Sequence, residues 1–405
     1  MPNQRTFVIV GAALCGAKAA ETLRDEGFDG RVVLIGTEAD RPYERPPLSK
    51  EYLRGEAEER PYVHDKDFYA EREIELRIST TVESIDVATS EVTLEDGESL
   101  EFDRLLLATG AEPRRLPVPG ADLDGVLYLR TVEESDALRE RIEQGGKLVT
   151  IGAGWIGSEV AASARQKGCE VSIVEQTAVP LEGVLGPELG RIYRDIHTDH
   201  GVEFLGGAGV QAFEGDGRVE AVRTDDGRQL EADFVVVGIG VAPRTKLAED
   251  AGLPINNGAL VSEFLQVEGT EIFAAGDVAN AAHPFYGERI RVEHWANALN
   301  QGPAAARNML EPGQRYDELP YFFSDQYDVG MEYAGYATDW DEVVFRGDTE
   351  SREFIAFWLK DGRVLAGMNV NVWDVTDDIQ ALIRSRAQVD VARLTDPDVP
   401  VKELA

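Results

Sequence analysis

Short apolar runs rich in β-branched residues alternate with helical patterns in the first part of the chain. Residues 6–10 lead into a glycine-containing turn, a helical pattern through Arg24, and a second apolar run over 32–35, with Glu38 close behind. Apolar runs of this length, separated by a helix, are typical of buried parallel strands. The pattern therefore predicts a strand–turn–helix–strand unit that ends beside an acid.

The same unit returns in the middle of the chain. Residues 147–151 enter a second glycine-containing turn at 152–157, and after a helical pattern the apolar run 171–174 ends at Glu175. Two copies of one pattern in the same order indicate a repeated supersecondary unit rather than an isolated turn.

A second pair of segments supports this repeat. Residues 103–114 read DRLLLATGAEPR and residues 233–244 read DFVVVGIGVAPR, so the two match at a constant offset of 130 positions. Two nucleotide-binding halves of related design are therefore expected in one chain, which predicts an α/β fold with two Rossmann-like domains.

The glycines of the two turns have mechanical roles in a G-x-G-x-x-G pattern. The first permits a tight turn, the second lets the backbone approach a pyrophosphate, and the third lets helix and strand pack closely. The helix N-terminus then offers N–H groups to the diphosphate, while the acid after the second strand accepts hydrogen bonds from ribose hydroxyls. The second turn is complete, with Gly152, Gly154 and Gly157. The first has Gly11 and Gly16 but Ala13 between them, and this methyl group is expected to loosen the fit rather than abolish binding.

The charge balance excludes one class of partner. The 405 residues include 40 Lys plus Arg against 75 Asp plus Glu, a formal net charge of −35. A surface this acidic repels the phosphate backbone of nucleic acids. The longest uncharged apolar run, residues 7–17, has eleven residues, whereas a membrane-spanning helix needs roughly 18. We expect no nucleic-acid partner and no membrane span.

Cysteine and histidine positions give no sign of a disulfide or a metal site. Cys15 and Cys169 are far apart and form no C-x-x-C, so neither a disulfide framework nor a redox dithiol is indicated, and a reducing, cytoplasmic location is expected. His197 and His200 are the only close pair among five histidines. They lie on a charged, helix-like stretch, which favours a solvated helix face over metal binding.

Residues 41–50 (RPYERPPLSK) resemble the segment that runs along FAD in flavoprotein reductases with two dinucleotide-binding domains. The match is strongest to the ferredoxin reductases that serve cytochrome P450 and aromatic-ring dioxygenase systems. It extends over the whole chain, and its further pieces are residues 108–110, 128–131, 273–277, 291–298 and 323–327.

The resemblance implies three domains. Residues 1–115 and 245–320 would form a discontinuous FAD domain, residues 116–244 an NADH domain, and residues 321–405 a smaller C-terminal α+β domain. The chain supports the last boundary independently, because residues 311–314 (EPGQ) are rich in turn formers and short aromatic, strand-like runs follow them.

The resemblance also assigns residues to FAD. The diphosphate would lie against Gly11, Ala13, Cys15 and Gly16, the adenosine ribose against Glu38 with Thr37, and the adenine against the backbone of Val82. Arg45 and Lys50 would face the diphosphate and isoalloxazine, and Asp277 would hold the ribityl chain, although Asp277 also suits the N-cap of a helix-like stretch from Val278. The remaining assigned residues would line the crossover turn or the flavin: Ala108, Thr109, Gly110, Arg130, His294 and Trp295.

The second glycine turn is assigned to the nicotinamide coenzyme. Gly152, Gly154, Ile156 and Gly157 would hold it, and residues Gly238, Ile239 and Gly240 would form a backstop. Glu175 would accept from a ribose 2′-hydroxyl but repel a 2′-phosphate, which favours NADH over NADPH. Glu159 resembles the acid of the family that pairs with Lys50, and such a buried pair would keep the lysine charged beside the flavin during hydride transfer.

The implied reaction is hydride transfer from NADH to FAD at about 3 to 3.5 Å, followed by one-electron transfer to a ferredoxin-type iron–sulfur protein that feeds an oxygenase. Disulfide reductases need a reactive cysteine near residues 46–50, which have none. A flavin NADH oxidase or quinone reductase remains the alternative, and a redox-gated interaction protein is less favoured. A monomer and a homodimer both remain open.

Two further positions depart from the family pattern. Gly183 stands where relatives commonly have an arginine that reaches the coenzyme, so weaker NADH binding is expected unless Arg191 substitutes. Phe323 lies in a segment where relatives often place tryptophan near the iron–sulfur partner. This second departure leaves the electron exit route open.

Overall fold

The apolar runs of the sequence become two parallel sheets in the computed structural model, which describes residues 5–57 and 59–404. The chain divides into two compact units. Unit 1 contains the chain up to Glu44, Arg60–Glu112 and Val241–Pro320, and unit 2 contains Arg45–Glu59, Pro113–Gly240 and the chain from Tyr321 onward. Each parallel sheet belongs to one unit.

Unit 1 is built on a parallel sheet with the strand order β19-β7-β1-β2-β3. Four of its strands, β1, β2, β7 and β19, are almost fully buried, as expected for a sheet covered on both faces, whereas the edge strand β3 is only partly buried. The strand bounds are β1 Thr6–Val10, β2 Arg31–Ile35, β3 Ile74–Arg77, β7 Arg104–Leu107 and β19 Ile272–Ala274. The helices of this unit are α1 Leu14–Asp25, α2 Phe68–Glu71, α7 Lys246–Asp250 and α8 Trp295–Leu310.

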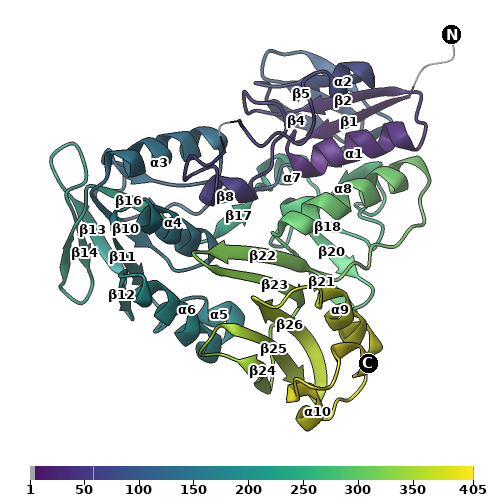
Figure 1. Ribbon diagram of the computed structural model, residues 1–405. Helices are drawn as coiled ribbons and strands as arrows, with labels where there is room; N and C mark the ends of the chain where they lie inside the picture. The colour runs from purple at the N-terminus through teal and green to yellow at the C-terminus, as the bar shows by residue number, and fades with distance from the viewer. Residues whose placement is uncertain (1–4, 58, 405) are drawn as a thin grey trace. The chain divides into compact units, whose positions relative to one another are not determined.

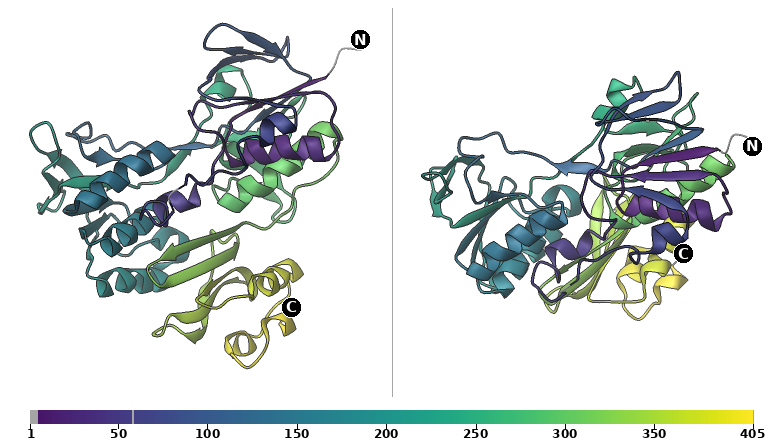
Figure 2. Two further views of the ribbon diagram at one scale, coloured as in Figure 1. Left: turned by 45° about the horizontal axis from the view of Figure 1, so that its top comes forward. Right: turned by 90° about the horizontal axis from the view of Figure 1, so that it is seen from above.

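Helices α1 and α8 lie side by side (Figure 1 and Figure 2). Gly302 of α8 permits this contact, because a Cβ atom there would lie 2.3 Å from the carbonyl oxygen of Cys15 on α1. Smaller sheets complete unit 1. They are β4 Val82–Asp86 with β5 Glu91–Leu94 and β6 Ser99–Glu101, β8 Ala111–Pro113 with β17 Val241–Pro243, and β18 Ala259–Val261 with β20 Ala279–His283 and β21 Glu288–Ile290.

Unit 2 repeats the design with the parallel order β12-β11-β10-β16-β9. The strand bounds are β9 Val126–Leu127, β10 Lys147–Ile151, β11 Glu170–Glu175, β12 Glu203–Gly206 and β16 Phe234–Val237. The helices are α3 Val132–Gln144, α4 Trp155–Gln166, α5 Glu182–Leu185 and α6 Pro187–Asp199. An antiparallel sheet joins β13 Val210–Glu214, β14 Ala221–Thr224 and β15 Gln229–Glu231.

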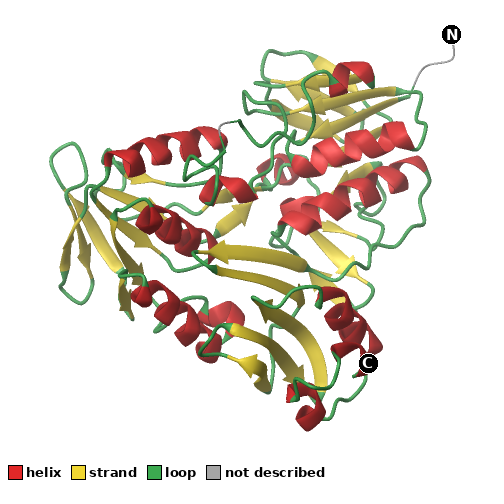
Figure 3. Ribbon diagram, viewed as in Figure 1, coloured by secondary structure: helices red, strands yellow, loops and turns green. Residues whose placement is uncertain are grey.

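The C-terminal part of unit 2 is an antiparallel sheet with short helices, shown in Figure 3. The strand order is β22-β23-β26-β25-β24. The bounds are β22 Tyr321–Gln326, β23 Val329–Gly335, β24 Glu342–Asp348, β25 Glu353–Lys360, β26 Arg363–Val370, α9 Thr376–Ser385 and α10 Val391–Thr395. Short 3₁₀ turns occupy Pro46–Ser49, Gly276–Val278 and Val401–Glu403 of the chain.

The predicted internal repeat is confirmed. Strands β7 and β16 occupy equivalent places beside β1 and β10, and both are followed by the paired short strands β8 and β17. The mixed α/β class with two nucleotide-type folds and a C-terminal α+β part is therefore correct.

Candidate functional site

The first glycine turn lies between β1 and α1 of unit 1. Gly11 has φ +120°, and a Cβ atom there would lie 2.0 Å from the carbonyl oxygen of Ala108 on the neighbouring strand. A Cβ atom at Gly16 would likewise lie 2.0 Å from the carbonyl oxygen of Gly11. Ala13 is the N-cap of α1 in an extended conformation and provides no side-chain cap. The first N–H groups of α1 are therefore left to an incoming group, which suits a cofactor diphosphate.

Other residues predicted for FAD also lie in unit 1. Glu38 follows β2 and accepts a hydrogen bond from Tyr43 Oη. Thr109 and Gly110 form the crossover after β7, where Thr109 Oγ1 donates to the Arg244 carbonyl at 3.0 Å and the Arg244 N–H donates to the Gly110 carbonyl at 2.9 Å. Cys15 is buried on α1, Thr37 is exposed just after β2, and Val82 opens β4.

Asp277, His294 and Trp295 are brought close to one another in unit 1. Asp277 is 7% exposed, and its charge acts on the imidazole of His294. Burial nevertheless lowers the pKa of His294 to about 4, which makes this imidazole neutral near pH 7. Trp295 begins α8 and donates from Nε1 to Glu44 Oε2 at 2.5 Å. Burial raises the pKa of Glu44, and the Trp295 bond opposes that rise.

The prediction of a helix-like stretch after Asp277 is wrong. Residues 276–278 form one 3₁₀ turn, and Ala279–His283 is strand β20, paired with β18 and β21. Pairing on both sides outweighs the local helix signal of a short stretch rich in alanine and asparagine.

In unit 2, Glu159 is the centre of a buried cluster. Lys50 Nζ donates to Glu159 Oε2 at 2.9 Å, and Ser49 Oγ donates to the same oxygen at 2.5 Å. Ser324 Oγ donates to Glu159 Oε1 at 2.7 Å. The Lys50 ammonium also lies 5.7 Å from the ring centroid of Phe323. The predicted Lys50–Glu159 pair is thus present, with side chains 7% and 4% exposed.

Arg45 and Arg130 also meet in unit 2. Arg45 Nη1 donates to the carbonyl oxygen of Arg130, just before α3. Thr131 then caps α3 in a capping box with Glu134. The local sequence thereby fixes where Arg130 stands.

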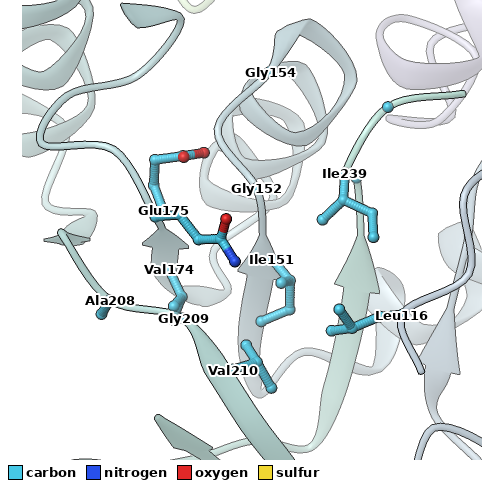
Figure 4. A pocket seen from close by; sticks show the side chains of 13 residues that line it. Leu116, Ile151, Gly152, Gly154, Val174, Glu175, Ala208, Gly209, Val210 and Ile239 are labelled. Carbon is cyan, nitrogen blue, oxygen red and sulfur yellow. The ribbon is translucent and has the colours of Figure 1, made fainter. Parts of the chain in front are cut away.

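The second glycine turn borders a cavity of about 430 Å³ at the ends of β10, β11 and β16. Figure 4 shows Glu175 beside the loop of Gly152 and Gly154, with Ile239 across from it. Gly152 has φ +92°, and a Cβ atom there would lie 2.5 Å from the carbonyl oxygen of Gly238. The predicted residues that line this cavity are Gly152, Gly154, Glu175, Gly238, Ile239 and Gly240.

Three residues predicted for the coenzyme lie outside the lining of this cavity. Ile156 is 44% exposed on the first turn of α4. Gly157 serves helix packing, because a Cβ atom there would lie 2.2 Å from the carbonyl oxygen of Gly152. Glu159 belongs to the buried cluster with Lys50.

Glu175 closes β11 as predicted, and its carboxylate also supports the turn. Oε2 accepts from the Ala153 N–H at 2.7 Å, while Oε1 accepts from the Thr177 N–H at 2.9 Å and its hydroxyl at 3.0 Å. The charge is therefore held at one wall of the cavity.

The solvated face predicted for the histidine pair is wrong for His197. His197 is fully buried on α6, and burial lowers the pKa of its imidazole to about 4. His200 is partly exposed, and its ring stacks on Tyr327. The charged residues of α6 occupy its other faces, which is why the stretch looked solvated.

Sequence reasoning gave no role to several residues of the cluster. Ser49 and Ser324 complete the hydrogen bonds of Glu159, and Trp155 packs edge-on against Tyr193 and Phe322, with ring centroids 5.7 and 5.1 Å away. Segments 46–50 and 323–327 both carried the family resemblance, and that was the available signal for the two serines.

Three features concern what the described residues lack. Cys15 and Cys169 are both free thiols. Within residues 5–57 and 59–404, no group of three or more acidic, histidine or cysteine side chains is placed so that it could hold a metal ion. Across the same residues, every helix is too short or too polar to cross a bilayer.

Comparisons with known proteins cover almost the whole chain. The putidaredoxin reductase of Pseudomonas putida is 36% identical over 404 residues, which cover 98% of this chain and 96% of that protein. The ferredoxin–NAD(+) reductase component of the anthranilate 1,2-dioxygenase system of Burkholderia cepacia is 38% identical and covers 98% of each chain. The crystal structure of the covalent putidaredoxin reductase–putidaredoxin complex matches with a TM-score of 0.95 and 36% identity, covering 98% of this chain and 97% of that one.

Family models agree with these relatives. The model described as reductase C-terminal matches residues 321–405, and the model described as pyridine nucleotide-disulphide oxidoreductase matches residues 5–302. The chain belongs to the pyridine nucleotide-disulphide oxidoreductase family.

Proposed function

We propose that this protein is an NADH-dependent flavoprotein reductase that passes electrons from NADH through FAD to a ferredoxin-type iron–sulfur protein, which feeds an oxygenase. The observation that carries the proposal is the similarity over almost the whole chain to reductases named for ferredoxin and for dioxygenase systems. Two Rossmann-type folds supply the places for two dinucleotides, one in each unit.

We assign the FAD diphosphate to the turn of Gly11, Ala13, Cys15 and Gly16. The adenosine side is assigned to Glu38, Thr37 and Val82. The flavin side is assigned to Arg45, Lys50, Ala108, Thr109, Gly110, Arg130, Asp277, His294 and Trp295. The uncapped start of α1 and the close glycine contacts fit a diphosphate, which supports this assignment.

We assign NADH to the cavity of unit 2. Gly152 and Gly154 give the backbone approach to the diphosphate, and Gly238, Ile239 and Gly240 line the opposite wall. Glu175 disfavours a 2′-phosphate because its charge is fixed at the wall by backbone donors. Ile156, Gly157 and Glu159 lie on α4, which follows the glycine turn. We assign them to the coenzyme side of the protein, where Gly157 lets α4 pack closely against the turn.

The residues of the chain then divide the work of the reaction. FAD supplies hydride acceptance and one-electron release, which no side chain offers. Lys50 presents a fixed positive charge, and Glu159 keeps that charge in place inside the protein with help from Ser49 and Ser324. His294 stays neutral near pH 7, so its imidazole presents no positive charge beside Asp277.

The domain assignment follows the family. Residues 1–115 and 245–320 form the FAD domain, residues 116–244 the NADH domain and residues 321–405 the C-terminal α+β domain. Two free, buried cysteines support a reducing, cytoplasmic location. We propose no oligomeric state between monomer and homodimer.

The test is reconstitution. Purified protein is expected to be yellow, with one FAD per chain released intact by denaturation, and to bleach the iron–sulfur absorbance of a matching ferredoxin when NADH is added. NADH consumption at the full rate without any protein carrier would instead indicate an oxidase or quinone reductase. Colourless protein that takes up no FAD under native conditions would contradict the proposal.

A further inference from the structure

The coenzyme cavity of unit 2 has a wall that two segments of the chain build together. Glu175, at the end of β11, and Gly209, just before β13, both line it. The Ala208 N–H donates to the Glu175 carbonyl oxygen at 3.0 Å, which joins the two segments. Figure 4 shows Glu175 and Gly209 on one side of the cavity, with Ile239 across from them.

Asp225 is fixed to this wall through both its backbone and its side chain. It directly follows β14, whose last residue Thr224 pairs with Val210 at the start of β13. The Asp225 N–H donates to the Gly209 carbonyl oxygen at 2.9 Å, and Asp225 Oδ1 accepts from the Gly209 N–H at 2.9 Å. The carboxylate is therefore held in one place, although the residue is exposed to solvent.

The missing side chain of Gly209 lets the Asp225 carboxylate lie against the wall. A Cβ atom at Gly209 would lie 2.8 Å from Asp225 Oδ2 and 3.6 Å from Gln176 Nε2. The carboxylate and the Gln176 amide therefore approach the same point, one from each segment. Because Gln176 itself lines the cavity, the charge of Asp225 lies at the border of the cavity and beside the residue that follows Glu175.

The cation in the same turn is directed to a different carboxylate. Arg228 forms an ion pair with Asp226. The side chain of Asp226 also contributes more than the charge of Asp225 to the raised pKa of the Arg228 guanidinium. Asp225 thus keeps its charge at the cavity wall, in addition to the charge of Glu175.

Charge at this wall decides which nicotinamide coenzyme is accepted. In Rossmann-type folds an acid at the end of the second strand accepts from the ribose 2′-hydroxyl of NADH, whereas sites for NADPH supply an arginine for the 2′-phosphate. A phosphate monoester has a charge of about −1.5 to −2 at pH 7. A 2′-phosphate on a ribose held at Glu175 would therefore be repelled by every carboxylate along the wall.

We propose that Asp225 is a second specificity-determining residue, which adds its charge to that of Glu175 against the 2′-phosphate of NADPH. The inference rests on the proposed function and on the assignment of NADH to this cavity. Asp225 acts through its charge, while its hydrogen bonds with Gly209 fix where that charge lies. The residue belongs to the loop after β14, outside the strand–turn–helix–strand unit that contains Glu175.

The position of Gln176 gives this proposal a second consequence. Gln176→Arg would put a guanidinium where the amide now approaches the Asp225 carboxylate. The introduced cation would then pair with Asp225 inside the protein, and less of its charge would act on a 2′-phosphate. Removing the charge of Asp225 is therefore expected to help NADPH more in the presence of Gln176→Arg than in its absence.

The first test measures binding without turnover. FAD-loaded protein with oxidised flavin is titrated with NAD⁺ and with NADP⁺ by isothermal titration calorimetry, so that no hydride is transferred. In Asp225→Asn, which keeps an oxygen to accept from the Gly209 N–H, the ratio of Kd for NADP⁺ to Kd for NAD⁺ is expected to fall by about fivefold, the upper range for one exposed charge. Kd for NAD⁺ should stay constant.

Two further variants separate charge at this wall from other effects. Asp216→Asn removes the same charge from the exposed turn between β13 and β14, at the other end of the same antiparallel sheet, and is the control. Its ratio of Kd values should equal that of wild type. Asp225→Ser also offers an oxygen to the Gly209 N–H and should show the same fall as Asp225→Asn.

The second test asks whether charge is the cause and whether position 176 is coupled to Asp225. At 1 M NaCl the Debye length is about 3 Å, so the difference between Asp225→Asn and wild type should largely disappear. At low salt, adding Asp225→Asn to Glu175→Ala with Gln176→Arg should lower the ratio by about tenfold, because the change also releases the introduced cation.

An unchanged ratio in Asp225→Asn, an equal fall in Asp216→Asn, or a difference that persists at 1 M NaCl would overturn the role of Asp225. The proposed function would then still stand if the wild-type protein binds NAD⁺ and reduces a ferredoxin with NADH. Equal factors with and without Gln176→Arg would contradict the coupling to position 176. Wild-type protein that binds neither coenzyme would overturn the proposed function, and this inference with it.

Discussion

At the residue scale, Glu159 shows how one carboxylate is made tolerable inside the protein. Its two oxygens accept hydrogen bonds from Lys50, Ser49 and Ser324, so no part of its charge lacks compensation. A buried pair of this kind adds little net stability compared with apolar packing. Removing one partner, however, leaves the other charge buried and uncompensated.

Lys50→Ala is therefore expected to lower the free energy of unfolding by about 3–5 kcal/mol. Urea titration followed by circular dichroism, at equal FAD loading, measures the change. Lys147→Ala is the control, because it breaks an exposed pair with Glu231 and should leave the midpoint almost unchanged. A double variant, Lys50→Met with Glu159→Leu, should recover part of the loss. Equal midpoints for Lys50→Ala and wild type would show that water reaches Glu159.

Gly183 is a second position where a single substitution is expected to change one property, here the binding of NADH. It lies exposed on α5, and a Cβ atom there would meet nothing within 4 Å, so an arginine fits without strain. Gly183→Arg is expected to lower KM for NADH by about tenfold, because a charge-assisted contact contributes about 1.5–3 kcal/mol. Hydride transfer at saturation should change little, since ground and transition states share the contact.

Steady-state and single-turnover kinetics separate these two effects. Arg191, exposed on α6, is the competing candidate for the same role. If KM stays constant in Gly183→Arg while Arg191→Ala weakens NADH binding severely, Arg191 already makes the contact. Gly183→Lys gives a matched cation without the planar fork and should show a smaller gain.

At the element scale, the end of β11 joins a strand to the coenzyme cavity. Replacing Glu175 with Ala and Gln176 with Arg is expected to shift the ratio of kcat/KM toward NADPH, because the change removes the repulsive charge and supplies a cation. The structure adds a second effect. Glu175 also holds the Ala153 and Thr177 N–H groups, so kcat/KM for NADH should fall as well.

Rates with both coenzymes measure this shift. Glu170→Ala, at the exposed start of the same strand, is the control and should leave the ratio constant. An unmodified enzyme that prefers NADPH would contradict the role given to Glu175. A double variant that loses both activities equally would show that the carboxylate mainly supports the turn.

How far the sequence predicted the elements depends on where their partners lie. Strands β1, β2, β10 and β11 of the parallel sheets could be predicted because a run such as Val32–Ile35 is apolar throughout, whichever strand it pairs with. The sequence did not single out β3, whose residues Ile74–Arg77 alternate apolar and charged side chains. β20 could not be predicted, because its pairing with β18 and β21 outweighs local propensity. The prediction for His197 failed because it weighed the charged residues of α6 and not the spacing of His197 with Leu189, Tyr193 and Ile196, which together form the buried face of this helix.

For the candidate site, the sequence predicted the local patterns but not the contacts between distant residues. The glycine turns and Glu175 are local patterns, and Gly152, Gly154 and Glu175 line the cavity of unit 2. The hydrogen bond from Ser324 to Glu159 joins residues 165 positions apart, which no local pattern encodes. Only the packing of β22 against α4 brings these two side chains together.

At the scale of the whole molecule, the dominant feature is the excess of negative charge. With 40 cationic and 75 acidic residues, the formal net charge is −35, and a charge this far from zero destabilises the compact state by self-repulsion. Added salt has two opposing effects. It screens this repulsion, and it also weakens exposed ion pairs, of which each contributes at most about 1 kcal/mol.

The repulsion is expected to win, because it acts between all the unpaired acids while each ion pair acts alone. The Debye length falls from about 30 Å at 0.01 M to about 10 Å at 0.1 M salt, so most of the gain in Tm should occur over this range of NaCl. Differential scanning calorimetry of the FAD-loaded protein measures it, and NaCl avoids the surface exclusion that sulfate would add. Glu83→Gln combined with Glu268→Gln, two exposed positions, should raise Tm at low salt and reduce the salt response. A Tm that falls with NaCl would show that the ion pairs outweigh the net charge.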